Sequence, residues 1–174
     1  TKVYHVGEVD IHAVDGIDFE VQKGEFVVIV GPSGAGKTTV INLITRFYDP
    51  AAGCVKIDGI NVRDVTLGSL RSRVGVLMQD PFIFKGTIID NIRYGRPEAT
   101  DEECIEAAKR IYADRVAERY PDGFYAKTEE GGEGLSAGEK QMISFARMVL
   151  KNPAVVILDE ATSSVDSETE ELIQ

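Results

Sequence analysis

Apolar and polar positions follow one another along this chain in a way that predicts short buried strands separated by helices. Apolar, β-branched runs at 26–30, 74–78 and 154–158 are typical of buried strands. Residues 54–59 predict another strand that ends in a tight turn, and 39–48 place apolar side chains at helical spacing. The strand at 154–158 is expected to be the most clearly buried of these. The pattern indicates an α/β fold.

From about residue 86 to 150 the pattern becomes helical. Thr100 to Glu103 matches a capping box and predicts a helix through about Ala117. Ser136 to Glu139 matches a second capping box and predicts a helix that runs to about Leu150. The acidic, glycine-rich residues 129–134 between these helices predict a loop.

A glycine-rich segment lies between the predicted strand at 26–30 and the predicted helix at 39–48. Gly31-Pro32-Ser33-Gly34-Ala35-Gly36-Lys37-Thr38 matches the P-loop pattern G-x-x-x-x-G-K-[ST] at every fixed position. Its glycines let successive backbone N–H groups point at phosphate oxygens, and the helix that follows presents its positive end to the same anion. Lys37 is expected to reach the β- and γ-phosphates, and Thr38 to offer its hydroxyl to Mg²⁺. The chain is therefore predicted to bind a nucleoside triphosphate.

Composition restricts the partners of such a site. The 174 residues fit a single domain, and no apolar run approaches the roughly 18 residues that a membrane helix needs. A formal net charge of −10 argues against nucleic acid as the main partner. Cys54 and Cys104 are isolated, so we expect neither a metal site nor a disulfide framework from them, in keeping with a reducing cytosol.

Two carboxylates follow the last predicted strand. Asp159 comes at the carboxyl end of that strand, where α/β sheets bind ligands, and it can hold Mg²⁺ directly or through water. Glu160 beside it can orient and deprotonate an attacking water, a role worth roughly 10²–10⁴ in rate. A P-loop alone leaves kinases, GTPases, helicases and transport ATPases open, and these carboxylates narrow the choice to a triphosphate-hydrolysing site.

One further motif carries a resemblance to a known family. Leu135-Ser136-Ala137-Gly138-Glu139-Lys140-Gln141 resembles the LSGGQ signature of ATP-binding-cassette (ABC) ATPases. Other elements of that family follow in its order: Tyr4 resembles the aromatic A-loop residue that stacks on adenine, Gly31–Thr38 the Walker A motif, Gln79 the Q-loop glutamine, Val155–Glu160 the Walker B motif, and Ser163–Asp166 the D-loop.

The resemblance implies a fold and a domain organisation. It implies a P-loop NTPase core with a mostly parallel sheet, an N-terminal antiparallel β subdomain and a helical subdomain. Residues 1–174 are then a single ABC ATPase domain that is incomplete at its C-terminal end. The nucleotide-binding core with its β subdomain is expected in 1–85 and 151–174, and the helical subdomain with the signature in 86–150.

The resemblance also implies ATP and Mg²⁺ as ligands and assigns residues to them. The implied catalytic residues are Glu160, Lys37 and Gln79, and the implied metal ligands are Thr38, Gln79 and Asp159. The implied nucleotide-binding residues are Tyr4, Gly31, Pro32, Ser33, Gly34, Ala35, Gly36, Lys37, Thr38, Thr39, Ser136, Gly138 and Glu139. In this family two domains pair head-to-tail, as homo- or heterodimers, so that the signature of one closes on the γ-phosphate held by the other.

Within the family, different parts of the chain resemble different branches. Residues 45–50, 67–71, 79–88 and 91–95 are similar to multidrug and lipid exporters, in which this domain is fused behind a membrane domain. The start of the chain, from residues 2–8 through 25–27, is more similar to ATPases of the lipoprotein-release and macrolide-efflux type. A natural intermediate and a chimera both remain open. The resemblance implies an exporter's transmembrane domain as partner and a location at the cytoplasmic face of the membrane.

The chain departs from the family pattern at two sites. Ala137 and Glu139 stand where the signature has glycine and glutamine, and Glu139 adds a negative charge near a site for an anion. Tolerated drift and a heterodimeric exporter with one weakened site both remain open. The switch histidine is the second departure, because His5 and His12 both precede the P-loop and the sequence stops at Gln174. We therefore expect ATP binding with weak or no sustained turnover by this chain alone.

The leading prediction is an ATPase that powers transmembrane export. The alternatives are a soluble ABC-type ATPase that acts on nucleic acid or ribosomes, and a binding-only fragment with little turnover. The compact helical segment between P-loop and signature argues against the DNA-repair members, which carry long coiled coils there.

Overall fold

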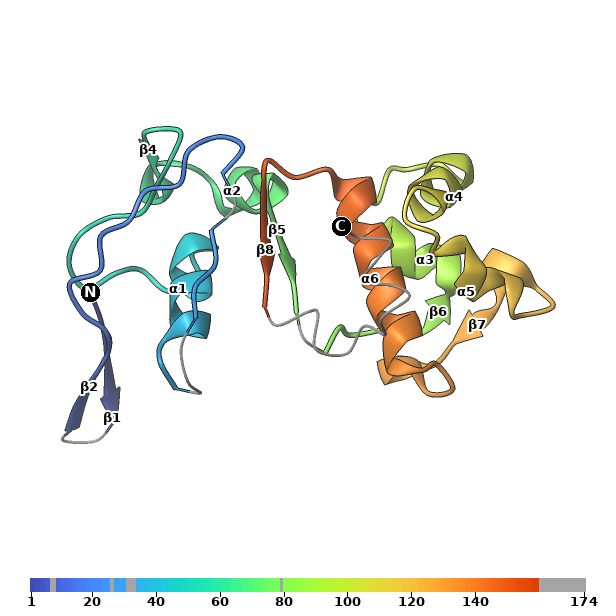
Figure 1. Ribbon diagram of the computed structural model, residues 1–174, viewed down its shortest axis with the longest axis horizontal. Helices are drawn as coiled ribbons and strands as arrows, with labels where there is room; N and C mark the ends of the chain where they lie inside the picture. The colour runs from blue at the N-terminus through green and yellow to red at the C-terminus, as the bar shows by residue number, and fades with distance from the viewer. Residues whose placement is uncertain (7–8, 26, 31–33, 79, 160–174) are drawn as a thin grey trace. The chain divides into compact units, whose positions relative to one another are not determined.

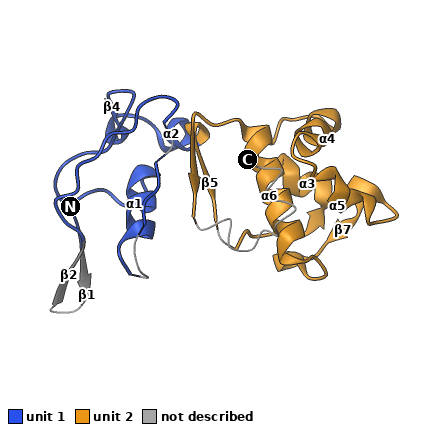
Figure 2. Cartoon of the chain, viewed as in Figure 1, with its two compact units in different colours: residues 1–71 blue, residues 72–174 orange. Residues whose placement is uncertain are grey.

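The computed structural model shows a mixed α/β fold (Figure 1). The structure describes residues 1–6, 9–25, 27–30, 34–78 and 80–159. The chain divides into two compact units, residues 1–71 (unit 1) and 72–174 (unit 2) (Figure 2). The α/β class predicted from the sequence is confirmed. None of the helices in the described residues is long and apolar enough to cross a membrane.

The described part of unit 1 contains antiparallel hairpins. They are formed by β1 (Lys2–Val6) with β2 (Val9–Val14), and by β3 (Lys56–Ile57) with β4 (Ile60–Asn61). Asp58 and Gly59 join β3 to β4 with positive φ angles of 51° and 77°. That pair of angles is the one a tight hairpin turn requires, and glycine adopts it without steric cost. The predicted tight turn is therefore confirmed, whereas the strand before it is Lys56–Ile57, shorter than the strand predicted from Cys54.

Helix α1 (Lys37–Ile44) ends earlier than the predicted range of 39–48. The Thr45 hydroxyl donates to the Ile41 carbonyl at 2.8 Å, and Arg46 has a left-handed φ of 53°. The Arg71 guanidinium donates to the carbonyl of Thr45 at 3.3 Å. These contacts satisfy carbonyls at the helix end, so the chain leaves the helix although its apolar spacing continues.

The prediction of a buried strand at 26–30 is wrong for the residues of this range that the structure describes. Residues 27–30 form no strand, and Val28 and Val30 are 65% and 84% exposed. β-Branched side chains favour an extended backbone, but a strand also needs a neighbour to complete its hydrogen bonds. Among the described residues, no strand pairs with 27–30.

Unit 2 contains the parallel pairing expected of the predicted core. Strand β5 (Val74–Leu77) pairs with β8 (Val155–Leu158), with Leu77 opposite Leu158. β5 is buried as predicted, whereas β8 exposes 51% of Val156 and 42% of Leu158, so the prediction that β8 is the most buried strand is wrong. Among the described residues β8 has one partner strand, and one face of a two-stranded sheet stays open.

The remaining helices of the described residues lie between Val62 and Lys151. They are α2 (Leu67–Arg73), α3 (Ile88–Arg93), α4 (Asp101–Lys109), α5 (Asp114–Glu118) and α6 (Ala137–Lys151), with the short pair β6 (Gly86–Thr87) and β7 (Lys127–Thr128) and the 3-10 turns Val62–Asp64, Gly123–Tyr125 and Glu130–Gly132. Capping boxes at Thr100 and Ser136 are confirmed, and α6 ends one residue beyond the predicted Leu150.

The helix predicted from Thr100 through Ala117 is interrupted. Tyr112 adopts a left-handed φ of 59°, and the Ala113 N–H donates to the Ala108 carbonyl at 2.9 Å. This bond across a left-handed residue is the Schellman pattern that closes a helix. The predicted helix is therefore two helices, α4 and α5, because a local backbone cap ends the first of them.

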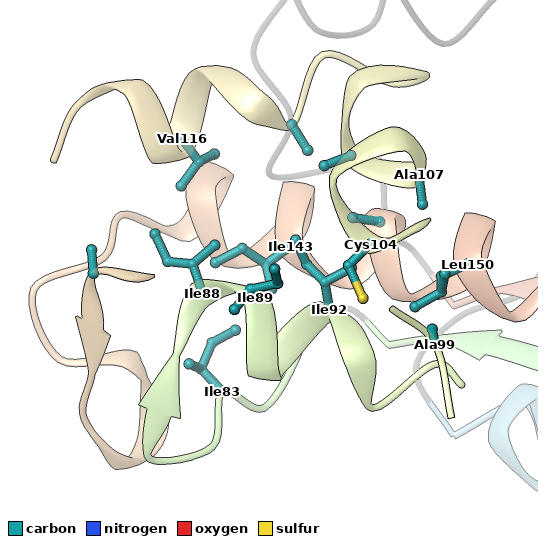
Figure 3. Packing of buried hydrophobic residues seen from close by; sticks show 14 residues of the cluster. Ile83, Ile88, Ile89, Ile92, Ala99, Cys104, Ala107, Val116, Ile143 and Leu150 are labelled. Carbon is teal, nitrogen blue, oxygen red and sulfur yellow. The ribbon is translucent and has the colours of Figure 1, made fainter. Parts of the chain in front are cut away.

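The helices of unit 2 enclose a contiguous apolar core (Figure 3). Its buried members are Ile83, Ile88, Ile89, Ile92, Ala99, Cys104, Ala107, Ala108, Ala113, Val116, Ala126, Ile143, Ala146 and Leu150. Small residues on α4 and α5 face isoleucines on α3 and α6, which allows short helices to pack closely. This core fixes the start of α6, where the signature lies.

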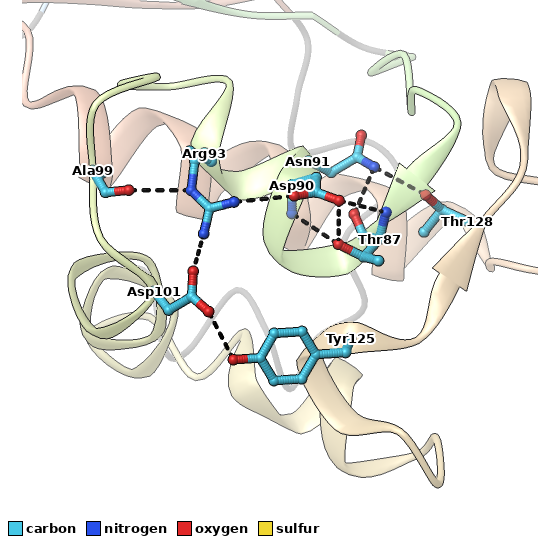
Figure 4. Close-up of polar contacts among 8 residues, drawn as sticks. All are labelled: Thr87, Asp90, Asn91, Arg93, Ala99, Asp101, Tyr125 and Thr128. Atoms are coloured by element: carbon cyan, nitrogen blue, oxygen red, sulfur yellow. Dashed lines mark hydrogen bonds and ion pairs between the residues drawn. The ribbon is translucent and has the colours of Figure 1, made fainter.

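Polar side chains connect the same helices (Figure 4). Arg93 donates to the Ala99 carbonyl at 3.1 Å and pairs with Asp90 at 3.0 Å and with Asp101. The Tyr125 hydroxyl donates to Asp101 at 2.7 Å, and this hydrogen bond raises the pKa of Tyr125. Arg93 therefore ties the end of α3 to the start of α4.

The two cysteines are expected to differ sharply in reactivity. Both are free, but Cys54 is exposed, whereas Cys104 is fully buried in the core and burial raises the pKa of its thiol. Iodoacetamide at mildly alkaline pH should modify Cys54 and spare Cys104, since it reacts with accessible thiolates. Intact-mass spectrometry should show one adduct on the native protein and two in denaturant. Two adducts at equal rates on the native protein would contradict this packing.

Candidate nucleotide site

The glycines of the predicted P-loop adopt the backbone that the motif requires. Gly34 and Gly36 have φ angles of 83° and 88°, in the left-handed region that other residues rarely adopt. Gly36 is the residue before α1, so the helix begins at Lys37 and places Lys37, Thr38 and Thr39 in its first turn. Gly31, Pro32 and Ser33 lie outside the described residues.

The start of α1 fits an anion. Gly36 has no side chain with which to cap the helix, and the first turn contains no acidic residue. The backbone N–H groups of a first helical turn have no partner inside the helix and carry the positive end of its dipole. A phosphate group matches these donors in charge and in hydrogen bonding.

Asp159 lies at the carboxyl end of β8, as predicted. Its backbone N–H donates to the Leu77 carbonyl at 2.9 Å, which extends the parallel β5–β8 pairing by one residue. Thr38 belongs to unit 1 and Asp159 to unit 2, so their joint binding of Mg²⁺ stays a prediction. In the described ranges no three His, Cys, Asp or Glu side chains gather as a metal cluster. A Mg²⁺ ion bound mainly by phosphate oxygens, a hydroxyl and one carboxylate requires no such cluster.

The other predicted residues of the P-loop half of the site are described only in part or not at all. The backbone of Tyr4 pairs with that of Ile11 in the β1–β2 hairpin. Gln79, Glu160 and the D-loop segment 163–166 lie outside the described residues. The roles of these residues in adenine stacking, metal binding and catalysis stay predictions.

The signature forms the start of α6. The Ser136 Oγ accepts the Glu139 N–H at 3.2 Å, and the Glu139 carboxylate accepts the Ser136 N–H at 2.7 Å. Both halves of the predicted capping box are therefore present. A Cβ added at Gly138 would meet no atom of the described residues within 4 Å, so those residues leave the space beside this turn open.

Glu139 has a cationic partner that sequence reasoning did not identify. Its side chain is 10% exposed, and its Oε1 lies 3.0 Å from Nη1 of Arg119, whose side chain is 69% exposed. Arg119 follows the last residue of α5. The two residues are far apart in sequence on different helices, and no local pattern predicts that they meet.

A second polar network holds the segment after Gln79. Arg147 of α6 donates to the carbonyls of Asn91 and Phe82, both at 2.6 Å. Asn91 of α3 accepts the Phe84 N–H at 2.9 Å and donates to the Phe84 carbonyl at 2.9 Å. It also donates to Thr128 at 3.0 Å, as Figure 4 shows. Burial lowers the pKa of Arg147 to about 10, so it remains charged at neutral pH. A single asparagine among the isoleucines of α3 was a sequence signal for this network, although its partners were not predictable.

This network borders a groove of about 290 Å³ on unit 2. Its lining includes Phe82, Phe84, Tyr94, Met148, Arg147 and Lys151. The rings of Phe84 and Tyr94 stack with centroids 4.1 Å apart, and Phe82 and Tyr94 are half-exposed, at 51% and 56%. The groove thus combines exposed aromatic surface with two cationic side chains.

Comparison with known proteins assigns the chain to a family. The family model described as ABC transporter matches residues 14–163. The chain is 50% identical over 162 residues to the uncharacterized ABC transporter ATP-binding protein YknV of Bacillus subtilis (strain 168), covering 93% of this chain and 27% of that protein. It is 50% identical over 153 residues to a fatty acid ABC transporter ATP-binding/permease protein of Mycobacterium tuberculosis (strain CDC 1551 / Oshkosh), covering 88% of this chain and 24% of that protein.

A solved structure gives the same assignment. The structure of a bacterial Atm1-family ABC exporter with ATP bound matches 98% of this chain with a TM-score of 0.91 and 42% sequence identity. The match covers 30% of that exporter chain, and the chain spans about a quarter of the curated relatives above. The ordered motifs, the glycine geometry at α1 and these similarities agree, and the chain belongs to the ABC transporter family as an ATP-binding domain of its ATPases.

Proposed function

We propose that this chain binds and hydrolyses ATP to power export through a membrane, as the nucleotide-binding domain of an ABC exporter. The observation that carries the proposal is the start of α1, where a left-handed Gly36 is followed directly by Lys37 and Thr38. This arrangement supports binding of the β- and γ-phosphates by backbone N–H groups and by the Lys37 ammonium. The names of the relatives, which include exporters and permeases, favour export over action on nucleic acid or ribosomes.

The residues of the proposed ATP site bind the phosphates, the adenine and the metal, and one of them accepts a proton. Gly31 through Thr39 surround the phosphates, and Tyr4 stacks on adenine. Thr38, Gln79 and Asp159 hold Mg²⁺, which when bound neutralises charge on the phosphates. Glu160 accepts a proton from the attacking water. All of these residues belong to the nucleotide-binding core that the sequence predicts in 1–85 and 151–174.

The site is proposed to be completed by a second ABC domain, paired head-to-tail in a homo- or heterodimer. Ser136, Gly138 and Glu139 of one domain then approach the γ-phosphate bound to the other. The Ser136 Oγ already accepts the Glu139 N–H, so its own hydroxyl proton is left to donate to a phosphate oxygen. The open space at Gly138 supports close approach of a partner.

The groove at Phe82 and Tyr94 supports a transmembrane partner. We propose that a segment of the exporter's membrane domain occupies it, which places this domain at the cytoplasmic face of the membrane. Exposed aromatic rings supply apolar contact, and Arg147 and Lys151 match an acidic side chain on that segment. The ATP-binding/permease relatives are about four times as long as the matched region, which leaves room for such a domain.

Calorimetric titration tests the proposed ligand. ATP should bind the chain with one site per chain, and omission of Mg²⁺ should weaken the binding because the phosphate charge is then less well neutralised. AMP is the control, since it lacks the phosphates that Lys37 and the glycine loop contact. Equal affinity for ATP and AMP would contradict a phosphate-centred site.

A further inference from the structure

The Glu139 carboxylate is held in one position at the start of the signature helix. One oxygen accepts the Ser136 N–H at 2.7 Å, and the other lies 3.0 Å from the Arg119 guanidinium. The side chain is 10% exposed and therefore has little water to screen its charge. Glu139 cannot turn away from the signature without breaking both contacts.

A fixed carboxylate is favourable for the helix and unfavourable for the ligand. The positive end of the α6 dipole stabilises a negative side chain in the first turn. A γ-phosphate that approaches the same turn from a second chain is itself an anion, and like charges in a partly dry interface repel. The signature of this chain therefore needs a compensating cation in order to accept a phosphate.

Arg119 is placed to supply that cation. It caps α5, whose Val116 is buried in the same core as Ile143 of α6, so the backbone at Arg119 is fixed relative to the signature helix. The neighbouring cation, Lys140, donates to the Gly131 carbonyl at 2.7 Å and so engages the preceding loop. The ion pair at Glu139 is with Arg119.

We propose that Arg119 is a positioning residue that neutralises Glu139, so that the signature can close on a triphosphate bound to a second chain. This inference rests on the proposed function. It also supports tolerated substitution at position 139 over a weakened second site, because the added charge has its own counter-charge. With a neutral glutamine at 139, Arg119 becomes dispensable for this purpose.

The test is a double-mutant cycle on ATP-driven pairing. The full 174-residue chain with Glu160→Gln serves as the hydrolysis-blocked parent, and sedimentation gives its dimer dissociation constant in MgATP. Arg119→Ala should weaken pairing about tenfold when Glu139 is present. When Glu139→Gln is already present, adding Arg119→Ala should change pairing by less than about twofold, so that the double variant pairs about as well as Glu139→Gln alone. Arg119→Lys, which keeps the charge, should pair about as well as the parent.

Matched controls separate charge compensation from folding. Arg110→Ala removes a cation from the same unit, where Arg110 pairs with Glu106 at 3.8 Å on an exposed face of α4, and it should leave pairing unchanged. ATP affinity of the isolated chain should be the same in all variants, because Arg119 acts through Glu139 on a nucleotide bound to the second chain. If Arg119→Ala weakens pairing only by destabilising the fold, its thermal unfolding midpoint falls and Glu139→Gln does not restore pairing. Restored pairing in the double variant therefore indicates charge compensation.

The outcomes distinguish this inference from the function on which it rests. If the parent fails to pair with itself in ATP, the homodimeric form of the proposed two-chain site is overturned and the role of Arg119 in it falls as well. If the parent pairs but Arg119→Ala pairs equally well, or the double variant is as weak as Arg119→Ala, Arg119 does not act through Glu139. In those cases the proposed function stands and the inference is wrong.

Discussion

Replacing Glu160 by Gln is expected to slow ATP hydrolysis by about 10²–10⁴-fold while ATP affinity stays within about twofold. Glutamine has nearly the same shape as glutamate but cannot accept a proton from water. Asp159, the preceding residue, is anchored at the strand end through the bond from its N–H to the Leu77 carbonyl. The substitution therefore removes the proposed base without removing the proposed metal ligand.

Single-turnover hydrolysis of radiolabelled ATP measures this effect, with calorimetry for binding. Glu98→Gln, an exposed glutamate after α3, is the matched control and should hydrolyse ATP like the wild type. An unchanged rate in Glu160→Gln would remove Glu160 from the role of general base. A parallel loss of ATP binding would instead assign it to the nucleotide pocket.

Replacing Lys37 by Ala is expected to weaken ATP binding by roughly 10- to 150-fold. A hydrogen bond to a charged group contributes about 1.5–3 kcal/mol, and each 1.4 kcal/mol corresponds to tenfold in affinity. Lys37 is the first residue of α1, so we propose that its ammonium and the helix N–H groups act on the same anion. Alanine preserves the helix because it has the highest helix propensity, and it removes the ammonium together with the aliphatic stem of the side chain.

Titration calorimetry with ATP and ADP measures the loss at Lys37. Lys56→Ala, which removes an exposed lysine of β3 in the same unit, is the control and should bind ATP like the wild type. Circular dichroism should show the same helix content in both variants. Wild-type affinity in Lys37→Ala would contradict a phosphate site at the start of α1.

Local sequence signals predicted the local structure well. The capping boxes at Thr100 and Ser136 were predictable because each consists of contacts across three residues, and such contacts do not depend on the rest of the fold. The tight turn at Gly59 was predictable for the same reason. The left-handed angles of Gly34 and Gly36 agree with the spacing of glycines in the P-loop motif.

Predictions that depended on distant partners were less accurate. The end of α1 is set in part by Arg71, which donates to the Thr45 carbonyl, and apolar spacing within the helix contains no information about it. The absence of a strand among the described residues 27–30 has a similar origin, since pairing requires a neighbouring strand. Exposure along β8 likewise depends on how many strands flank it.

In the candidate site, too, features set by neighbouring residues were predictable and features set by distant partners were not. Motif spacing identified the P-loop and the signature, whose chemistry lies in consecutive residues. The ion pair of Arg119 with Glu139 and the bonds of Arg147 to Asn91 join residues on different helices. Such pairs become visible only when the packing of α3, α5 and α6 is known, because nothing near either residue in sequence marks its partner.

The central claim is that the P-loop of one chain and the signature of another form one ATP site, and mixing two defective variants tests it most directly. Lys37→Ala disables the P-loop. Gly138→Asp places a carboxylate beside the signature, at a position where an added Cβ meets no atom of the described residues within 4 Å. Each variant alone should show almost no single-turnover hydrolysis, and the equimolar mixture should regain it through one intact composite site. Hydrolysis by the mixture no higher than by the separate variants, or wild-type hydrolysis by Gly138→Asp alone, would contradict the claim.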